Sequence, residues 1–331
     1  MGTRGAILIA GGAGYIGAHC CRAVADNGFT PVCYDDLSTG HRSFVQWGPL
    51  VVDDIADSRA VAETIRRYDV QAVMLFAASS AIGESVVDPQ RYYRNNVAGA
   101  LGLLEGMREA GCRRLVFSST GAVYGEAGPD PIPESAAGRA VNPYGRSKYM
   151  IEQILADYHA AYGLSAMALR YFNACGADAA GRIGELRDPE THLIPRALMA
   201  ILGHVGDFAI FGTDYDTPDG TAVRDYIHVD DLAAAHIAAL ERLLAGDPGG
   251  TYNLGTGRGH SVREVVDAIR EETGEHVPLV VRERRAGDPP ILVADCRRAA
   301  QQLGFMPKRS DLGTIIRSAW AWHQRAHPRR A

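Results

Sequence analysis

Lysine is scarce in this chain of 331 residues, and long apolar runs are missing. Only Lys148 and Lys308 are lysines among the 34 basic residues, so the other 32 are arginines. No segment approaches the ~18 consecutive apolar residues that a membrane-spanning helix requires. The residues before the first apolar run also lack the apolar region of a secretion signal. We therefore expect no membrane span and a cytoplasmic location.

Cysteine and charge are present, but not in patterns that indicate a metal site or a nucleic-acid partner. The six cysteines form no C-x-x-C pair, so we expect reduced thiols in a core rather than disulfides. The histidines are scattered, and the sequence predicts no metal site. A net charge of -5 gives no bias toward nucleic acid or anionic membranes. The 47% apolar content is enough for one large domain or two modest ones.

A glycine-rich turn follows the first apolar run, residues 6–10. It contains Gly11, Gly14 and Gly17 and leads into a helical pattern. This spacing matches the dinucleotide-binding fingerprint, in which free backbone N–H groups and a positive helix end receive a pyrophosphate. A tight turn that binds nothing would use the same residues.

Two carboxylates at Asp35 and Asp36 complete this fingerprint. They end the next apolar run, close to the spacing of about 20 residues expected for the carboxylate that binds the adenosine ribose. A carboxylate accepts a hydrogen bond from a 2′-hydroxyl and repels a 2′-phosphate, so the sequence favours NAD over NADP. The alternative is an aspartate that only caps a loop.

Apolar strands alternate with amphipathic helices up to about residue 170, and then the alternation weakens. This pattern predicts an α/β protein: a Rossmann-type doubly wound parallel sheet over residues 1–172, with a smaller α/β substrate-binding region over 173–331. Some strands and helices of the second region are expected to contribute back to the first. We expect strands at 50–52, 72–76, 115–118 and 166–170, and helices at 58–68, 90–110, 144–162, 230–245 and 262–274.

A tyrosine and a lysine lie one helical turn apart, at Tyr144 and Lys148. Their i,i+4 spacing places both side chains on one helix face. An adjacent ammonium stabilises a phenolate, which makes tyrosine usable as a general base. The lysine is informative because arginine stands at nearly every other basic position, although a surface lysine would also fit. Thr120, at the end of an expected strand, is placed to hydrogen-bond the substrate oxygen.

Several motifs together resemble the extended short-chain dehydrogenase/reductase superfamily, and within it the UDP-glucose (UDP-galactose) 4-epimerase family. The resemblance covers nearly the whole chain in the same order. Its motifs are GGAGYIG at 11–17, FAA at 76–78, GES at 83–85, NNV at 95–97, FSSTGAVYG at 117–125, PYGRSK at 143–148, RYFN at 170–173, VRDYIHV at 223–229 and YNLG at 252–255.

The resemblance implies a redox-neutral, NAD-dependent epimerisation at C4 of a UDP-hexose through a transient 4-keto sugar, in carbohydrate (galactose) metabolism. It implies catalytic roles for Tyr144 as the base, for Lys148 on the nicotinamide ribose and for Thr120 on the sugar. It also implies a homodimer formed through the helices at 90–110 and 144–162.

The resemblance also implies two sets of binding residues. The cofactor contacts are Gly11, Gly14, Tyr15, Ile16, Gly17, Asp35, Asp36, Asp54, Ile55, Phe76, Ala77, Ala78, Ser80, Asn96, Ser118, Tyr144, Lys148 and Phe172. The substrate contacts are Thr120, Tyr144, Asn173, His192, Leu193, Ala209, Ile210, Phe211, Arg224, Arg285, Asp288 and Leu292, with the two arginines on the diphosphate.

Departures from the family pattern leave alternatives open. Ala10 stands where threonine is usual, and Thr120 replaces the commoner serine. Ser80 stands where several relatives carry a lysine near the nicotinamide, so weaker cofactor retention is expected. Leu292 occupies a gate position where some members have a bulky tyrosine that excludes 2-N-acetyl sugars. We therefore expect partial acceptance of UDP-N-acetylglucosamine.

Related activities remain as alternatives. A UDP-pentose or UDP-N-acetylhexosamine 4-epimerase fits the same motifs. A nucleotide-sugar 4,6-dehydratase is disfavoured because Gly121 and Ala122 stand where those relatives carry acidic groups. A non-catalytic NAD-sensing protein is least favoured, because it would have no need for both Tyr144 and Lys148.

Overall fold

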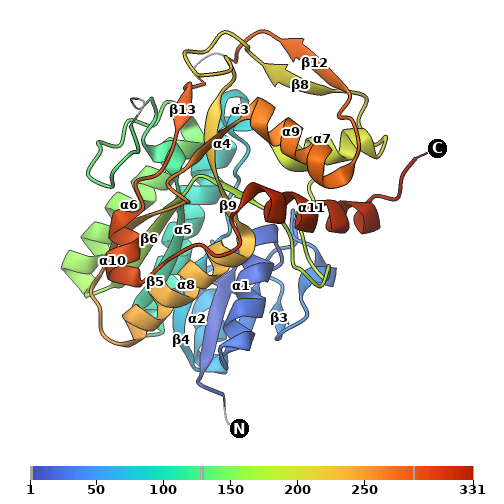
Figure 1. Cartoon of the computed structure of the whole chain (residues 1–331). Helices are drawn as coiled ribbons and strands as arrows, with labels where there is room; N and C mark the ends of the chain where they lie inside the picture. Colours follow the sequence, from blue (N-terminus) through green and yellow to red (C-terminus); the bar gives the residue numbers. More distant parts are fainter. Residues whose placement is uncertain (1–2, 127, 129, 286–287, 331) are drawn as a thin grey trace.

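A seven-stranded parallel sheet forms the centre of the computed structural model, which describes residues 3–126, 128, 130–285 and 288–330. Its order is β10-β6-β5-β4-β1-β2-β3 (Figure 1). The strands are β1 (Ala6–Ala10), β2 (Thr30–Tyr34), β3 (Leu50–Val51), β4 (Val70–Leu75), β5 (Arg114–Thr120), β6 (Ser165–Tyr171) and β10 (Gly249–Leu254). The strand order reverses between β1 and β4, and ligands of such sheets bind beyond the carboxyl ends of the strands at this point. The predicted doubly wound fold is confirmed.

Helices cover both faces of this sheet. One face carries α1 (Tyr15–Asp26) and α8 (Val229–Leu244), and the other carries α2 (Ser58–Tyr68), α5 (Gly99–Glu109) and α6 (Pro143–Tyr162). Alternate residues of β1 serve the two faces: Ile7 and Ile9 belong to one buried cluster, and Leu8 to the other. This alternation is why β1 reads as a continuous apolar run in the sequence.

The helix that carries Tyr144 and Lys148 has clear local start and stop signals. Asn142 caps it by accepting a hydrogen bond on Oδ1 from the Gly145 amide at 2.8 Å, and Pro143 fills the first helical position. Gly163 follows the last helical residue. The expected helix at 144–162 is therefore confirmed to within one residue.

The expected single helix at 90–110 is wrong in detail. The chain instead forms α4 (Pro89–Tyr92), a π-helical segment η2 (Tyr93–Ala98) and α5 in continuous succession. A π segment adds a residue to the turn, which a periodicity of 3.6 does not reveal. It carries Asn96, whose buried amide bonds Ser79 and Ser147, so the widened turn lies where two loops and α6 meet.

The second half of the chain forms smaller sheets packed against three helices. Strand β9 (Val223–His228) pairs with β7 (Asn173–Cys175), β11 (Gly259–Ser261) and β13 (Ile291–Leu292), and β8 (Phe208–Phe211) pairs with β12 (Leu279–Arg282). The helices α7 (Leu193–Ile201), α9 (Val262–Thr273) and α11 (Leu312–Ala326) share one buried cluster and lie together at one end of the molecule (Figure 1).

Two elements of this half belong to the central sheet layer. β10 is the edge strand beside β6, and α8 packs on α1. The remaining short elements are η1 (Arg42–Phe44), α3 (Ile82–Val87), η3 (Gly121–Val123) and α10 (Arg297–Leu303). Among the described residues, none of the helices combines the length and the apolar character needed to cross a bilayer.

Candidate active site

The glycine turn between β1 and α1 is shaped by close backbone contacts. Gly11 has φ +83°, and a Cβ there would lie 2.4 Å from the Ala77 nitrogen. A Cβ on Gly17 would lie 2.0 Å from the Gly11 carbonyl oxygen. At Gly14, the N-cap of α1, the nearest atom to an added Cβ is 3.4 Å away. The turn therefore requires glycine at Gly11 and Gly17 for packing, and Gly14 leaves the helix end open to a phosphate group.

Asp35 lies against this turn, as the sequence predicts. Its two carboxylate oxygens accept hydrogen bonds from the Ala13 and Leu37 amides, each at 2.9 Å. A carboxylate has further acceptor capacity on both oxygens, so these bonds fix Asp35 and still leave room for a ribose hydroxyl. Asp36 instead is exposed and bonds Ser38 in its own loop. The remaining acceptor positions of Asp35 and the open end of α1 together fit a dinucleotide.

The other expected cofactor contacts lie along the same carboxyl edge. The amides of Phe76 and Ala77 both donate to the Ala10 carbonyl, which ties the end of β4 to the end of β1. Asn96 donates to Ser147 on α6 at 2.9 Å. Residues Tyr15 and Ile16 begin α1, Asp54 and Ile55 follow β3, Ala78 and Ser80 follow β4, Ser118 lies in β5, and Phe172 follows β6.

Tyr144, Lys148 and Thr120 meet at this edge between α6 and β5. All three are buried, and the Lys148 ammonium donates to the Ser118 carbonyl at 2.9 Å. Burial lowers the pKa of Lys148 to about 7, against the nearby Glu152 carboxylate, which raises it. The ammonium is therefore already anchored on the strand that carries Thr120.

The Tyr144 phenol differs from the expectation in its electrostatics. Burial raises the pKa of Tyr144, while the Thr120 hydrogen bond and the charge of Arg187 lower it. The sequence predicted that Lys148 would lower this pKa, but the charge that lowers it in the structure is that of Arg187. Sequence patterns gave no signal for Arg187, because it comes from a distant loop.

The pocket around the tyrosine has an apolar wall. Phe172 stacks near Tyr124, with ring centroids 6.4 Å apart, and a Cβ on Gly121 would lie 2.9 Å from the Phe172 ring. Leu292 packs against the same group. Glycine at 121 is thus required by the ring that covers it, and no acidic side chain could occupy that position without displacing the ring.

A cavity of about 430 Å³, lined by two arginines, three carboxylates and a tyrosine, lies mainly in the second half of the chain. The Arg285 guanidinium stacks on Phe211 at 4.0 Å from the ring centroid, and Arg224 pairs with Asp288. The cavity is lined by Glu126, Tyr215, Asp216, Arg284, Arg285, Asp288 and Pro290. Tyr215 and Arg284 were not anticipated. Planar guanidinium groups over an aromatic ring suit a nucleoside diphosphate.

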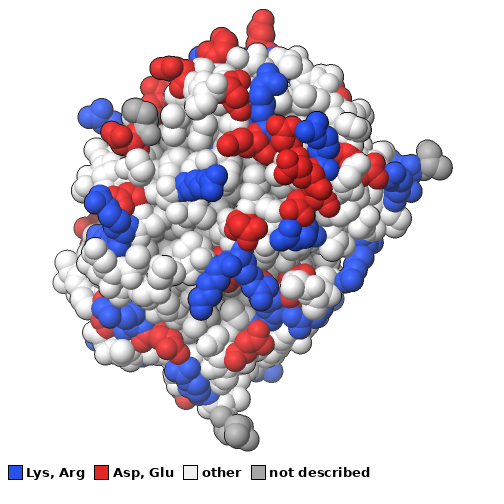
Figure 2. All heavy atoms as spheres, in the orientation of Figure 1, with Lys and Arg blue, Asp and Glu red and all other residues white. Residues whose placement is uncertain are grey.

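The remaining expected substrate residues lie on neighbouring elements. Ala209 and Ile210 lie beside Phe211 in β8, and Leu193 begins α7. Asn173 starts β7 and donates to the Asp225 carbonyl at 3.0 Å, which leaves its amide oxygen available. On the face shown in Figure 2, basic and acidic side chains are interspersed and do not form a single basic area.

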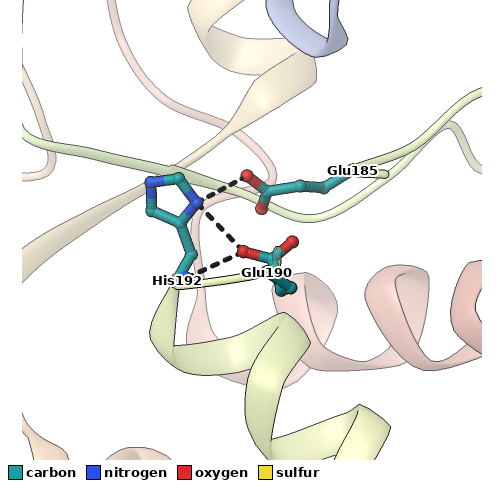
Figure 3. A group of neighbouring side chains, drawn as sticks. All are labelled: Glu185, Glu190 and His192. Atoms are coloured by element: carbon teal, nitrogen blue, oxygen red, sulfur yellow. Dashed lines mark hydrogen bonds and ion pairs between the residues drawn. The ribbon is translucent and has the colours of Figure 1, made fainter. Parts of the chain in front are cut away.

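His192 lies between two buried carboxylates that sequence reasoning missed. Its Nδ1 is 3.0 Å from Glu185 Oε1 and 3.3 Å from Glu190 Oε1 (Figure 3). The His192 side chain is 45% exposed, so loss of solvation lowers its pKa only in part, and the two carboxylates outweigh this and raise the pKa to about 9. The imidazole is therefore held as a cation at the start of α7.

These three side chains have the residue types of a metal site, and their ligand atoms lie within 4.8 Å of one another. The same oxygens already accept N–H donors, however. Glu185 Oε1 accepts from Arg187 Nε at 3.0 Å, and Glu190 Oε1 accepts from the Thr191 and His192 amides at 2.7 and 2.8 Å. Because these carboxylate oxygens already accept N–H groups, the cluster fits a protonated imidazole better than a metal ion.

A second buried ion pair also escaped the sequence analysis. Arg170 on β6 and Glu152 on α6 pair with side chains that are 7% and 8% exposed. Arg170 also donates to the Tyr124 hydroxyl at 2.8 Å, and that hydroxyl donates to Asn253 at 2.6 Å. The RYFN motif contained Arg170, but its partner is remote in sequence.

Comparison with known proteins agrees with this geometry. Residues 7–255 match the profile of the NAD dependent epimerase/dehydratase family. The UDP-glucose 4-epimerase of Rhizobium leguminosarum bv. trifolii is 48% identical over 97% of this chain and 98% of the relative. The solved UDP-glucose 4-epimerase of Brucella ovis, in complex with NAD, is 52% identical with a TM-score of 0.94, over 96% of this chain and 98% of that one.

A further solved relative carries both a cofactor and a nucleotide sugar. The UDP-glucose 4-epimerase of Stenotrophomonas maltophila, with bound NAD and formylated UDP-arabinopyranose, is 40% identical with a TM-score of 0.95 and covers 99% of this chain and 100% of that one. Coverage this complete, with a TM-score of 0.95, means that the fold is shared over the full length of both chains. The chain belongs to the NAD dependent epimerase/dehydratase family.

Proposed function

We propose that this chain epimerises C4 of a UDP-hexose, interconverting UDP-glucose and UDP-galactose with bound NAD and no net redox change. The observation that carries the proposal is the convergence of Tyr144, Lys148 and Thr120 beside the glycine turn, at the strand ends where cofactors of this fold bind. The relatives' names support the same activity. Residues 1–172 bind the cofactor and residues 173–331 bind the nucleotide sugar. Strand β10 and helix α8 of the second region pack in the first, β10 beside β6 and α8 against α1.

Each residue of the site then has a distinct role. Tyr144 accepts the proton of the sugar 4-hydroxyl, and Thr120 orients that oxygen. Lys148, anchored on the Ser118 carbonyl, holds the nicotinamide ribose. Bound NAD would supply a reversible hydride acceptor for C4, so that the 4-keto sugar can be reduced again on its other face. The glycine turn and Asp35 would hold the adenosine and pyrophosphate parts of the cofactor.

The diphosphate of the substrate needs cations in a partly closed site. Arg224 and Arg285 supply planar guanidinium groups beside the 430 Å³ cavity, and Asp288 fixes Arg224. His192 adds a third positive group at the start of α7. This division places the nucleotide on the second half of the chain and the reacting carbon near Tyr144.

The direct test is to incubate the purified protein with UDP-galactose, with and without added NAD, and to identify the products. We expect UDP-glucose to form. Tyr144→Phe should lower kcat by about 10²–10⁴-fold, because it removes the general base. Tyr162→Phe is a matched control on the same helix, since that residue is half exposed. Unchanged UDP-galactose with the wild-type protein and added NAD would exclude the activity.

We infer that the sugar range extends beyond hexoses. Leu292 packs against the cluster that contains Tyr124 and is shorter than a tyrosine, so it would take up less of the room that a 2-N-acetyl group needs. Wild-type protein should turn over UDP-N-acetylglucosamine, and Leu292→Tyr should lose this activity while keeping UDP-glucose turnover. UDP-xylose and UDP-arabinose belong in the same assay, because a smaller pentose meets no barrier here. No turnover of the N-acetyl sugar would end this proposal.

A homodimer through α5 and α6 is the assembly we propose. These helices expose Leu101, Met150 and Tyr162, which are 39%, 41% and 51% exposed. Between them lies a groove of about 360 Å³ lined by side chains such as Met107 and Tyr158. Self-complementary helical faces of this kind suit a two-fold interface.

Light scattering after size exclusion tests the dimer. A Leu101→Glu/Met150→Glu variant should be monomeric, while Met306→Glu, at an exposed site elsewhere, should not change the mass. A monomeric wild-type protein would contradict the proposal.

The six cysteines carry free thiols, five of them buried, and we assign the protein to the reducing cytoplasm on that basis.

A further inference from the structure

Arg187 joins the two halves of the chain across the cofactor edge. It lies in the loop between β7 and α7, in the second half. Its Nε donates to Glu185 Oε1 at 3.0 Å, and its Nη1 donates to Ser80 Oγ at 3.2 Å. Ser80 follows β4 in the first half, so this one side chain spans from the substrate region to the loop beside the reaction centre.

The carboxylate that holds Arg187 is itself fixed. Glu185 is 3% exposed and pairs with His192 through the same oxygen, as Figure 3 shows. Its backbone carbonyl accepts a hydrogen bond from Trp322 Nε1 of α11 at 2.8 Å. The guanidinium therefore projects from a point that α7 and α11 both support.

The other end of the bridge is tied to the catalytic helix. The amide of Ser79, next to Ser80, donates to Asn96 Oδ1 at 2.8 Å, and Asn96 donates to Ser147 of α6 at 2.9 Å. Ser147 lies between Tyr144 and Lys148 on that helix. Arg187 is thus connected to the helix that presents the phenol through Ser80, Ser79, Asn96 and Ser147.

The charge of Arg187 complements that of Lys148. The Lys148 ammonium is buried, and its pKa of about 7 means that it is only partly protonated at neutral pH. A guanidinium stays charged at every pH at which the protein is folded. Arg187 lowers the pKa of Tyr144 and also that of Tyr171, so its field covers both buried phenols.

We propose that Arg187 is a positioning residue of the reaction centre: tethered to Glu185 and Ser80, and linked through Asn96 to α6, it places a permanent cation at the edge where Tyr144 accepts the proton of the sugar. The proposal rests on the proposed function. The Thr120 hydroxyl from β5, the Tyr171 phenol from β6 and the charge of Arg187 act on Tyr144, and the Tyr92 ring from α4 packs edge-on against it with ring centroids 6.5 Å apart. Lys148 lies one turn further along the same helix.

The test compares Arg187→Gln, Arg187→Lys and Ser80→Ala with Arg182→Gln. Arg182 lies in the same loop and is half exposed, and its partner Asp178 keeps a second arginine, Arg22. The first readout is the pH titration of the phenolate in protein freed of cofactor, measured by ultraviolet difference absorbance against Tyr144→Phe. The second is the pH profile of kcat with UDP-galactose.

Arg187→Gln should move the phenolate titration and the acid limb of the kcat profile to higher pH. At neutral pH, kcat should fall about tenfold with a smaller change in KM. Arg187→Lys should restore most of the loss, and Ser80→Ala should give an intermediate shift because the charge stays but its tether is lost. Arg182→Gln should match the wild type.

Two outcomes are separable. A wild-type titration and pH profile in Arg187→Gln would overturn the role of Arg187, whatever the activity. If Arg187→Gln does not fold, Ser80→Ala takes its place, and unshifted curves in that variant would overturn the proposal. The variants could show the expected titration shifts relative to a wild-type protein that never converts UDP-galactose. That result would overturn the proposed activity and leave the electrostatic role supported.

Discussion

Replacing Glu152 by glutamine should destabilise the protein strongly, because it leaves Arg170 buried without its carboxylate. Both side chains are less than a tenth exposed, and Glu152 also accepts a hydrogen bond from Ser119. Breaking one partner of such a pair costs about 3–5 kcal/mol. Unfolding entropy of about 2.1 cal/mol/K per residue over 331 residues gives about 0.7 kcal/mol/K, so Tm should fall by about 4–7 °C.

Circular dichroism during heating and urea titration measures this change. The matched control is Glu105→Gln, which breaks the exposed pair with Arg108 on α5 and should leave stability almost unchanged because solvent screens this pair. The double variant Glu152→Leu/Arg170→Met should recover much of the loss, since an apolar pair of similar volume leaves no uncompensated charge. Equal stability of Glu152→Gln and Glu105→Gln would refute the reasoning.

Three other changes probe the site. Gly17→Ala should lower NAD bound per purified chain and cost about 1–3 kcal/mol in urea, because its Cβ would lie 2.0 Å from the Gly11 carbonyl oxygen; a variant with full cofactor content would contradict this. The pKa of His192 is raised, so its stabilising contribution is complete below pH 6.5 and is lost as pH rises through about 9. The difference in urea midpoint between wild type and His192→Gln should therefore shrink over that interval, and a constant difference would argue against a charged imidazole. Lys148→Met should lose activity, but its free energy of unfolding at pH 7 should rise by roughly 1–3 kcal/mol, because burial disfavours the ammonium. Urea titration measures this change, and a less stable variant would show that the hydrogen bond to the Ser118 carbonyl dominates.

Local features were predictable because their causes are local. The start of α6 at Asn142 and Pro143, the turn at Gly11 and the place of Asp35 each depend on neighbours within a few residues or on one adjacent strand. The alternation of strands and helices predicted a doubly wound parallel sheet, and its strand order came only from the structure. Sequence periodicity failed at η2, where the helix widens without any change in residue type.

The electrostatics of the site could not be predicted in this way. Glu185, Arg187 and His192 are separated by a few residues but adopt no regular structure, so their mutual pairing depends on the packing of α7 and α11. Arg170 and Glu152 meet only because β6 and α6 are adjacent in the fold. The scarcity of lysine marked Lys148 for attention, yet nothing in the pattern indicated that an arginine from another loop faces the same phenol.

The return of β10 to the central sheet means that the cofactor half is not a detachable module. A fragment ending near residue 172 would leave the long edge of β6 with a row of unpaired N–H and C=O groups and would strip α8 from α1. Such an edge invites strand addition from other chains. Grafting this half onto another substrate region, or expressing it alone, would therefore have to bring residues 229–254 along.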